Sequence, residues 1–211
     1  MTEYLTNIIL LLNDLKGETI VSDRPGEKML CLTAPVGVVV GVVAWNFPLA
    51  LAVRKAGPAL IAGNAIIIKP HELTPIATFH LAKLALEAGV PTGIFSVVYG
   101  PGPSVGRQLV TGCDGKHDVG LVTLTGSTRA GHAIAAAVAP FATETSLEMG
   151  GKAPFIVLED ADLVAAVDAC VGSRMFNCGQ VCTCPERVLL HVDIADEFTG
   201  ASIFFFLSFV V

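Results

Sequence analysis

Residues 35–72 read PVGVVVGVVAWNFPLALAVRKAGPALIAGNAIIIKPHE, and this stretch decides the fold. Two short runs rich in Val and Ile, Val36–Ala44 and Ala65–Lys69, flank a segment of helical length, Leu49–Ile61. An apolar strand, a helix and a second apolar strand in this order form a βαβ unit, whose two strands lie parallel in one sheet. The stretch therefore predicts the start of an α/β fold with a doubly wound parallel sheet, covered by helices on both faces.

The same alternation of strands and helices continues toward the carboxyl terminus. Thr74-Pro75 predicts the start of one helix, with Thr74 as its cap and Pro75 at the first helical position. The further strands that we expect are Ile94–Tyr99, Val119–Leu124 and Pro154–Leu158, and the further helices are Pro75–Ala88, Ser104–Val110 and Thr128–Ala139.

The two ends of the chain do not follow this alternation. Residues 1–20 have apolar positions at helical spacing, and Gly17 ends the predicted helix. The turn residues Asp23-Arg24-Pro25-Gly26 between Glu18–Ser22 and Lys28–Thr33 predict a hairpin. After Phe198, the stretch TGASIFFFLSFVV has little polar patterning and no turn signal, so we expect an aberrant apolar tail at 199–211 rather than a helix.

Composition argues against several classes of partner. The net charge is -6 and Lys and Arg form no cluster, which argues against nucleic acid. The apolar stretches Ile8–Leu12 and Ile203–Val211 are far shorter than the roughly 20 residues that cross a bilayer, so no membrane partner is expected. No basic leader precedes an apolar stretch at the amino terminus, and we expect a cytoplasmic protein.

The carboxyl-terminal cysteines invite two different interpretations. Cys178, Cys182 and Cys184 have no second CxxC or HxxxH half to complete a tetrahedral site, so we expect no metal. In FNCGQVCTCPERV, Cys182 lies in a predicted loop between a helix at Leu163–Arg174 and a strand at Arg187–His191. Loops between regular elements display catalytic side chains, which suits a nucleophile, although most isolated cysteines are small buried hydrophobes.

Polar residues also follow the predicted strands. Glu148 in LEMGGK precedes two glycines that allow close approach of a ligand, and a partly buried carboxylate there suits a general base. Asn46 in WNFP follows the first strand of the sheet, where its amide can donate to an oxyanion or serve as a turn residue.

Three more strand ends carry residues suited to a nucleotide. Glu72, with Lys69, can bind ribose hydroxyls. The segment Gly126–Gly131 opens a helix and aims backbone N–H groups at a phosphate, and Gly100-Pro101-Gly102 forms a looser glycine turn. Each of these patterns alone is also typical of an ordinary turn.

Five motifs, WNFP, IIIKPHE, TGSTRAG, LEMGGK and GQVC, occur in this order at strand ends. Their order and spacing resemble those of the aldehyde dehydrogenase superfamily over about residues 16–198. The segments GQVCTCPERV and SDRPGE are most similar to the corresponding segments of bacterial lactaldehyde (glycolaldehyde) dehydrogenases. His71 stands where Ser is usual in the KPSE motif of this family.

The resemblance implies a reaction and a role for each motif. Cys182 would attack a small aldehyde, Asn46 and the Cys182 backbone N–H would hold the oxyanion, and Glu148 would activate the water that hydrolyses the thioester. The implied cofactor is NAD rather than NADP, because a 2′-phosphate would meet the like charge of Glu72. The implied cofactor-binding residues are Trp45, Lys69, Glu72, Gly102, Gly126, Ser127 and Gly131.

The resemblance also implies a domain organisation: an oligomerisation-type segment at 1–34, a Rossmann-like NAD-binding domain at 35–149, the beginning of a catalytic domain at 150–198, and the tail at 199–211. Intact members of the family form homo-oligomers and have a further stretch, with a second glutamate for the nicotinamide ribose, that these 211 residues lack. We therefore expect a truncated chain of low activity. The alternatives are a non-catalytic relic that keeps an NAD-binding surface, and a thiol hydrolase or zinc protein.

Overall fold

The computed structural model describes residues 2–10, 13, 15–112 and 116–208. The chain divides into two compact units, Met1–Met149 and Gly150–Val211. Cys113, one of the six cysteines, lies outside the described residues.

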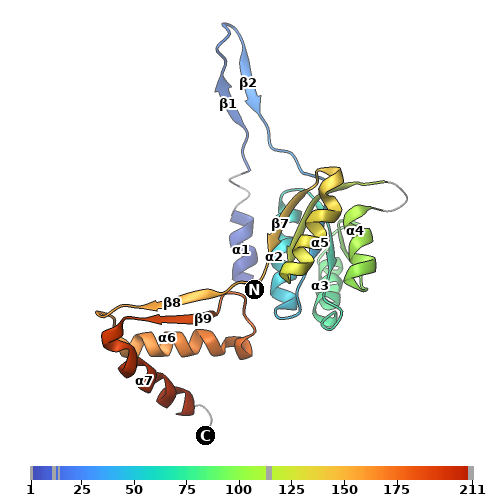
Figure 1. Cartoon of the computed structure of the whole chain (residues 1–211). Helices are drawn as coiled ribbons and strands as arrows, with labels where there is room; N and C mark the ends of the chain where they lie inside the picture. Colours follow the sequence, from blue (N-terminus) through green and yellow to red (C-terminus); the bar gives the residue numbers. More distant parts are fainter. Residues whose placement is uncertain (1, 11–12, 14, 113–115, 209–211) are drawn as a thin grey trace. The chain divides into compact units, whose positions relative to one another are not determined.

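A five-stranded parallel sheet is the centre of the first unit (Figure 1). Its strand order is β5-β4-β3-β6-β7, so the chain builds outward from β3 to β5, returns to the middle, and builds outward again to β7. This is the order of a dinucleotide-binding sheet, with the switch point between β3 and β6. The strands are β3 (Val38–Val42), β4 (Ala65–Lys69), β5 (Phe95–Val97), β6 (Val119–Thr125) and β7 (Glu144–Glu148). The prediction of an α/β fold with a doubly wound parallel sheet is confirmed.

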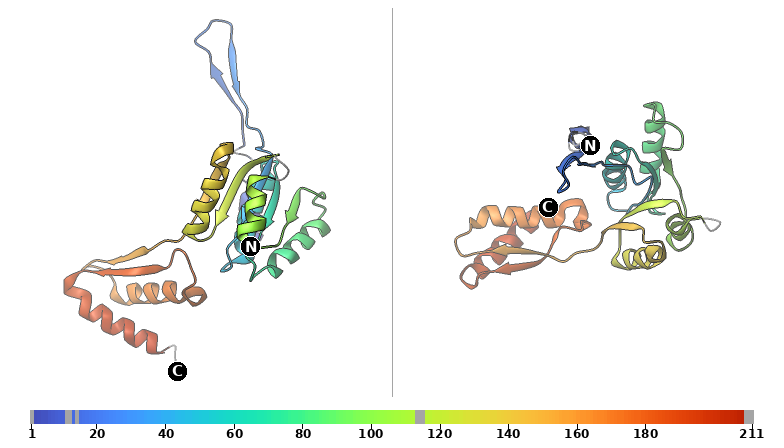
Figure 2. Two further views of the ribbon diagram at one scale, coloured as in Figure 1. Left: turned by 45° about the vertical axis from the view of Figure 1, so that its right-hand side comes forward. Right: turned by 90° about the horizontal axis from the view of Figure 1, so that it is seen from above.

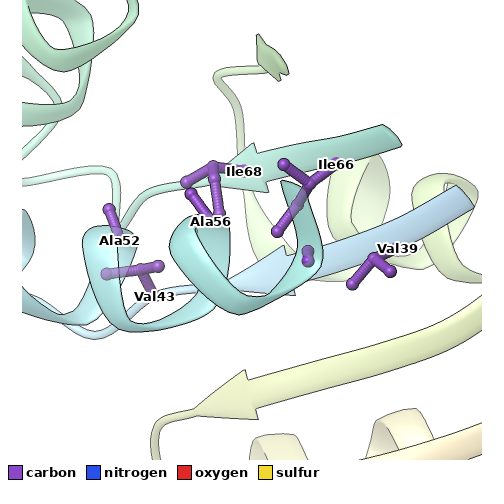
Figure 3. Packing of buried hydrophobic residues seen from close by; sticks show 7 residues of the cluster. Val39, Val43, Ala52, Ala56, Ile66 and Ile68 are labelled. Carbon is purple, nitrogen blue, oxygen red and sulfur yellow. The ribbon is translucent and has the colours of Figure 1, made fainter. Parts of the chain in front are cut away.

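Helices cover both faces of this sheet (Figure 2, right). Alternate residues of a strand point to opposite faces, so Val39 packs on one side and Val40 on the other. Helices α2 (Pro48–Ile61) and α3 (Ile76–Glu87) lie over the Val39 face, and α4 (Arg107–Thr111) and α5 (Thr128–Val138) over the Val40 face. Figure 3 shows how closely the small residues of α2, among them Ala52 and Ala56, approach Ile66 and Ile68 of β4.

The amino-terminal hairpin is present where the turn residues predict it. Strands β1 (Glu18–Val21) and β2 (Lys28–Cys31) pair antiparallel, and every residue of both strands is exposed. The preceding helix α1 (Thr2–Leu10) is shorter than predicted, and Leu15 lies outside it. Ile8 of α1 is buried because α1 packs against α2.

The second unit contains a two-stranded parallel sheet, β8 (Ala153–Val157) and β9 (Pro185–Leu190), with helices α6 (Leu163–Met175) and α7 (Ala195–Ser208). Val157, Val167, Cys170, Ile194 and Phe198 form its core. The strand predicted at Pro154–Leu158 is present as β8, in the sheet of the second unit rather than in the five-stranded sheet. The fifth strand of that sheet is β7, an edge strand of sequence ETSLE whose largely exposed, polar residues hide it from a search for apolar runs.

Three local predictions also need correction. Residues 199–208 continue helix α7 rather than forming an irregular tail, because Phe198 is buried against α6 and the acidic Asp196 and Glu197 occupy the first turn. The segment expected as one helix at Ser104–Val110 is a π-helical turn, η2 (Gly102–Gly106), followed by α4. Pro75 is itself the N-cap of α3, and the Thr74 hydroxyl is buried without a hydrogen-bond partner.

Candidate active site

The carboxyl ends of the five parallel strands lie at one edge of the first unit's sheet, and most of the predicted site residues follow them. Asn46 follows β3, Glu72 follows β4, Gly102 follows β5, Ser127 follows β6, and Glu148 ends β7. In open α/β sheets this edge binds ligands, above all where the strand order reverses. The structure therefore places at one edge of the sheet the five positions that were selected from the predicted strand ends.

Glu72, Lys69 and Gly102 form one anchored corner of this edge. The Gly102 N–H donates to Glu72 Oε1 at 2.7 Å, and Lys69 Nζ lies 3.6 Å from the same oxygen. Lys69 is only 2% exposed and also donates to the Pro70 carbonyl. The pKa of Glu72 lies below its ordinary value. The largest cause of the lowering is a hydrogen bond from the backbone of Glu72 itself. Partial burial, the second cause, acts in the opposite direction and raises the pKa. The Gly102 amide and the charges of Lys69 and His71 lower the pKa further. The corner thus holds an ionised carboxylate in place at a sheet edge.

The glycines expected to line a pyrophosphate have other partners. The Gly126 N–H donates to the Glu148 carbonyl, and the Gly131 N–H donates to the Ser127 carbonyl. A Cβ on Gly131 would collide with Met149 Sδ, so this glycine has a packing reason for its identity. Gly126, Gly131 and Gly102 can therefore allow close approach of a ligand because they have no side chain. Their own backbone N–H groups already donate to oxygen atoms of the protein.

Ser127 and the start of α5 keep the geometry of an anion site. The Ser127 side chain caps α5 by accepting from the Ala130 N–H at 3.2 Å. The first turn of a helix carries N–H groups without partners inside the helix and the positive end of its dipole. An anionic group can therefore be bound at the switch point.

Trp45 and Asn46 occupy the turn after β3. Trp45 is 44% exposed and Asn46 is half-buried. The N-cap position of α2 belongs to Phe47, and Pro48 begins the helix, so Asn46 is not the cap residue of this helix.

Glu148 lies close to a buried amine that sequence reasoning missed. Lys55 of α2 is 9% exposed and donates to Thr123 Oγ1 at 2.9 Å. Burial lowers the pKa of Lys55 from 10.5 to about 8, and the negative charge of Glu148 opposes that shift. Glu148 itself is exposed, so the partial burial expected for it is not present.

The signal for Lys55 was present in the sequence. Ala52, Lys55, Ala56 and Ala59 follow helical spacing, and all four are buried on the face of α2 that packs on the sheet. A lysine on the apolar face of a helix needs a polar partner. Thr123, on the neighbouring strand β6, is that partner.

Cys182 belongs to the second unit, in a turn between the 3₁₀ segment Phe176–Gly179 and β9. Its side chain is exposed, and Gly151 of the LEMGGK motif lies against its backbone carbonyl, 3.2 Å from the position of a Cβ on that glycine. The Cys182 thiol is therefore accessible. A side chain at position 151 would crowd the backbone carbonyl of Cys182.

The neighbouring cysteines differ from Cys182 in exposure or backbone conformation. Cys184 is buried, and its sulfur accepts from Arg174 Nη1 at 2.8 Å, in agreement with a packing role. Cys178 is exposed and has a positive φ of 57°. Its neighbours Asn177 and Gly179 also have a positive φ. Asn177 and Cys178, which are not glycines, store backbone strain in this conformation beside the turn.

Two negative findings apply to the part of the chain that the structure describes. Its His, Cys, Asp and Glu side chains form no group of three or more that could hold a metal ion, so the zinc alternative has no geometric support. Its helices include none with the length and apolar character needed to span a bilayer.

Comparison with known proteins gives a consistent result. The model of the aldehyde dehydrogenase family matches residues 1–203. The chain is 51% identical over 180 residues to a 3,6-anhydro-alpha-L-galactose dehydrogenase of Streptomyces coelicolor, covering 85% of this chain and 36% of that protein. It is 48% identical over 185 residues to a lactaldehyde dehydrogenase of Escherichia coli, covering 88% of this chain and 38% of that protein.

The solved structure of a 3,6-anhydro-L-galactose dehydrogenase in complex with NAP, a nicotinamide dinucleotide, has a TM-score of 0.90 and 44% identity. The match covers 96% of this chain and 42% of that structure. The chain thus spans well under half of the proteins that it matches. The family model and these similarities, which extend across both units, establish that the chain belongs to the aldehyde dehydrogenase family.

Proposed function

We propose that the protein oxidises a small aldehyde to a carboxylic acid with NAD, through a thioester on Cys182. The single observation that carries this proposal is the exposed Cys182 thiol in a turn of a chain with this family membership. Cys170 and Cys184 are buried, and only an accessible thiol can add to a carbonyl from solution.

The proposed reaction uses three side chains. The Cys182 thiolate adds to the aldehyde carbon, and the oxyanion that forms accepts hydrogen bonds from Asn46 and the Cys182 N–H. NAD, when bound, accepts the hydride that leaves this carbon. Glu148 then takes a proton from water as the water attacks the thioester, which releases the acid and restores the thiol. The exposure of Glu148 supports this role, because water can reach it directly.

We propose NAD rather than NADP as the cofactor because of the anchored Glu72 corner. A carboxylate held by Gly102 can accept from two ribose hydroxyls, whereas a 2′-phosphate would meet its negative charge. Lys69 neutralises part of this charge, so the expected preference is a matter of degree.

Alkylation of the 211-residue chain tests the nucleophile. We expect brief treatment with iodoacetamide to modify Cys182 at least about ten times faster than buried Cys170 or Cys184, because these thiols are shielded from solvent. Peptide mapping by mass spectrometry measures each site, and preincubation with glycolaldehyde should slow the labelling of Cys182 while exposed Cys31 serves as the control. Equal labelling of Cys182 and Cys170 would rule out the assignment.

Turnover by the 211-residue chain alone is expected to be low. Ile156, Leu158, Val188 and Leu189 of the second unit are exposed apolar side chains, and misplacement of reacting groups by an ångström costs orders of magnitude in rate. NADH formation with lactaldehyde or glycolaldehyde measures it, with Cys182→Ala as the test variant and Cys178→Ala as its matched control. Strong turnover that disappears only in Cys182→Ala would support the reaction and show that this chain suffices for it.

We also propose that the β1–β2 hairpin contacts a second copy of the chain and that the protein is cytoplasmic. Both faces of the hairpin are exposed, and one of them carries apolar Val21 and Leu30. The free thiols at the described cysteines suit a reducing compartment. Val21→Glu with Leu30→Glu should reduce the molecular mass in analytical ultracentrifugation, whereas Glu18→Gln should leave it unchanged. An unchanged mass in the double variant would remove the hairpin from the contact.

A further inference from the structure

His71 is a member of the Glu72 corner for which the proposed reaction has no use. Its Nε2 lies 3.7 Å from Glu72 Oε2, on the opposite carboxylate oxygen from Lys69 and Gly102. Its Nδ1 accepts a hydrogen bond from the Leu73 N–H at 3.2 Å. Because Nδ1 is the acceptor, the neutral ring carries its proton on Nε2, the nitrogen that faces the carboxylate.

Protonation changes this arrangement in two ways. The second proton goes to Nδ1, so the bond from the Leu73 N–H is lost and the ring is freed from its backbone tether. The ring also becomes a cation beside Glu72. Protonation therefore adds one positive charge to the group formed by Lys69, His71 and Glu72.

The other elements around this corner bring no competing charge to it. The η2 segment Gly102–Gly106 has the sequence GPSVG and contributes the Gly102 amide. Arg107 follows η2 and is not among the charges that act on Glu72. The charged side chains that act on Glu72 are Lys69 and His71.

Resting on the proposed role of Glu72 at the adenosine ribose, we propose that His71 determines how strongly this site rejects a 2′-phosphorylated dinucleotide. When His71 is neutral, Glu72 repels the phosphate and NAD is preferred. When His71 is protonated, its charge offsets that of Glu72 and attracts the phosphate, so the preference narrows. His71 is thus a specificity-determining residue whose charge makes the choice of cofactor depend on pH.

Cofactor titrations test this proposal without any need for turnover. Trp45 is the only tryptophan of the chain and lies at the same sheet edge, so its fluorescence can report binding of NAD or NADP to the full chain. The measured quantity is the ratio of the dissociation constants of NADP and NAD at about pH 5.5 and about pH 8, an interval in which histidine is the side chain that generally changes charge. The variants are His71→Gln and, as the matched control, His80→Gln, which replaces an exposed histidine of α3.

Lowering the pH should reduce the ratio of the dissociation constants of NADP and NAD in the unaltered chain. We expect this reduction to be about three-fold smaller in His71→Gln, a size typical of a partly exposed charge pair. The 2′-phosphate itself titrates near pH 6, but that contribution is common to all variants. His80→Gln should match the unaltered chain. The same pH dependence in His71→Gln as in the unaltered chain would overturn the inference.

Glu72→Gln distinguishes failure of this inference from failure of the proposed function. If that variant narrows the preference for NAD at about pH 8 while His71→Gln leaves the pH dependence intact, Glu72 contacts the ribose and His71 does not affect the choice of cofactor. If Glu72→Gln leaves the ratio unchanged, the proposed role of Glu72 is wrong and the inference about His71 is overturned with it.

Discussion

The two units of this chain differ in how completely their own residues enclose a core. In the first unit, helices cover both faces of the sheet, and Ile66 of β4 is 0% exposed. In the second unit the sheet has two strands, and Leu189 of β9 is 48% exposed.

The predicted site residues of the two units differ in the same way. The Glu72 corner of the first unit is tied by hydrogen bonds to neighbouring elements, whereas Cys182 of the second unit is an exposed turn residue. The described residues thus supply a well-supported sheet edge for the proposed cofactor site and a less enclosed position for the proposed nucleophile.

Truncation of a core side chain in each unit should sharpen this contrast most. Ile66→Ala should lower the free energy of unfolding of the first unit by about 3 kcal/mol, because it leaves a cavity in a fully buried cluster. The matched change Leu189→Ala should cost less than about 1 kcal/mol, because half of that side chain is already exposed. Urea unfolding followed by Trp45 fluorescence measures the first variant, and hydrogen exchange of β9 amides measures the second. Equal costs would contradict the difference in enclosure.

Lys55 should make the stability of the first unit depend on alkaline pH. Its pKa is about 8 when folded and 10.5 in a model peptide, so between these values the unfolded chain binds more protons and stability rises with pH. The rise attributable to Lys55 should reach about 2 kcal/mol between pH 8 and pH 10. Lys55→Met should flatten this part of the profile, whereas exposed Lys83→Met in α3 should leave the slope unchanged. A profile in Lys55→Met as steep as in the unaltered chain would mean that the amine is not desolvated.

Two helical glycines offer a smaller test of the same contrast. A Cβ on Gly131 of α5 would collide with Met149, whereas a Cβ on Gly172 of α6 meets no atom within 4 Å. Alanine favours a helix over glycine by about 1 kcal/mol at either position, but the collision at 131 costs roughly 1–3 kcal/mol. Gly172→Ala should therefore stabilise the second unit, and Gly131→Ala should destabilise or barely change the first. Thermal unfolding by circular dichroism compares them. A more stable Gly131→Ala would show that the first unit is packed more loosely than the structure indicates.

Sequence patterns predicted the apolar strands of both units and most of the helices that follow them. The apolar strands β3, β4 and β6 and the helices between them were recognised because buried parallel strands consist almost wholly of Val, Ile and Leu. Edge strand β7 escaped the same search because its residues are polar, and residues 199–208 escaped because an apolar helix without polar alternation has no helical signature.

For the site, the sequence indicated which residues follow the strands but not what they contact. The amides of Gly126 and Gly131 were expected at a phosphate, yet each donates to a protein oxygen. The pairing of Lys55 with Thr123 joins residues 68 positions apart. Such partners are fixed by tertiary packing, which strand and helix periodicities do not encode.

The measurement that tests the account most directly is the affinity of the 211-residue chain for NAD, with one site residue changed in each unit. The central claim is that the cofactor edge belongs to the first unit and depends on the anchored Glu72. Titration of Trp45 fluorescence with NAD should give Cys182→Ala the same dissociation constant as the unaltered chain, within about two-fold. Glu72→Gln should bind about ten-fold more weakly, the size expected for a lost charged hydrogen bond. A loss in Cys182→Ala as large as in Glu72→Gln, or full affinity in Glu72→Gln, would contradict the claim.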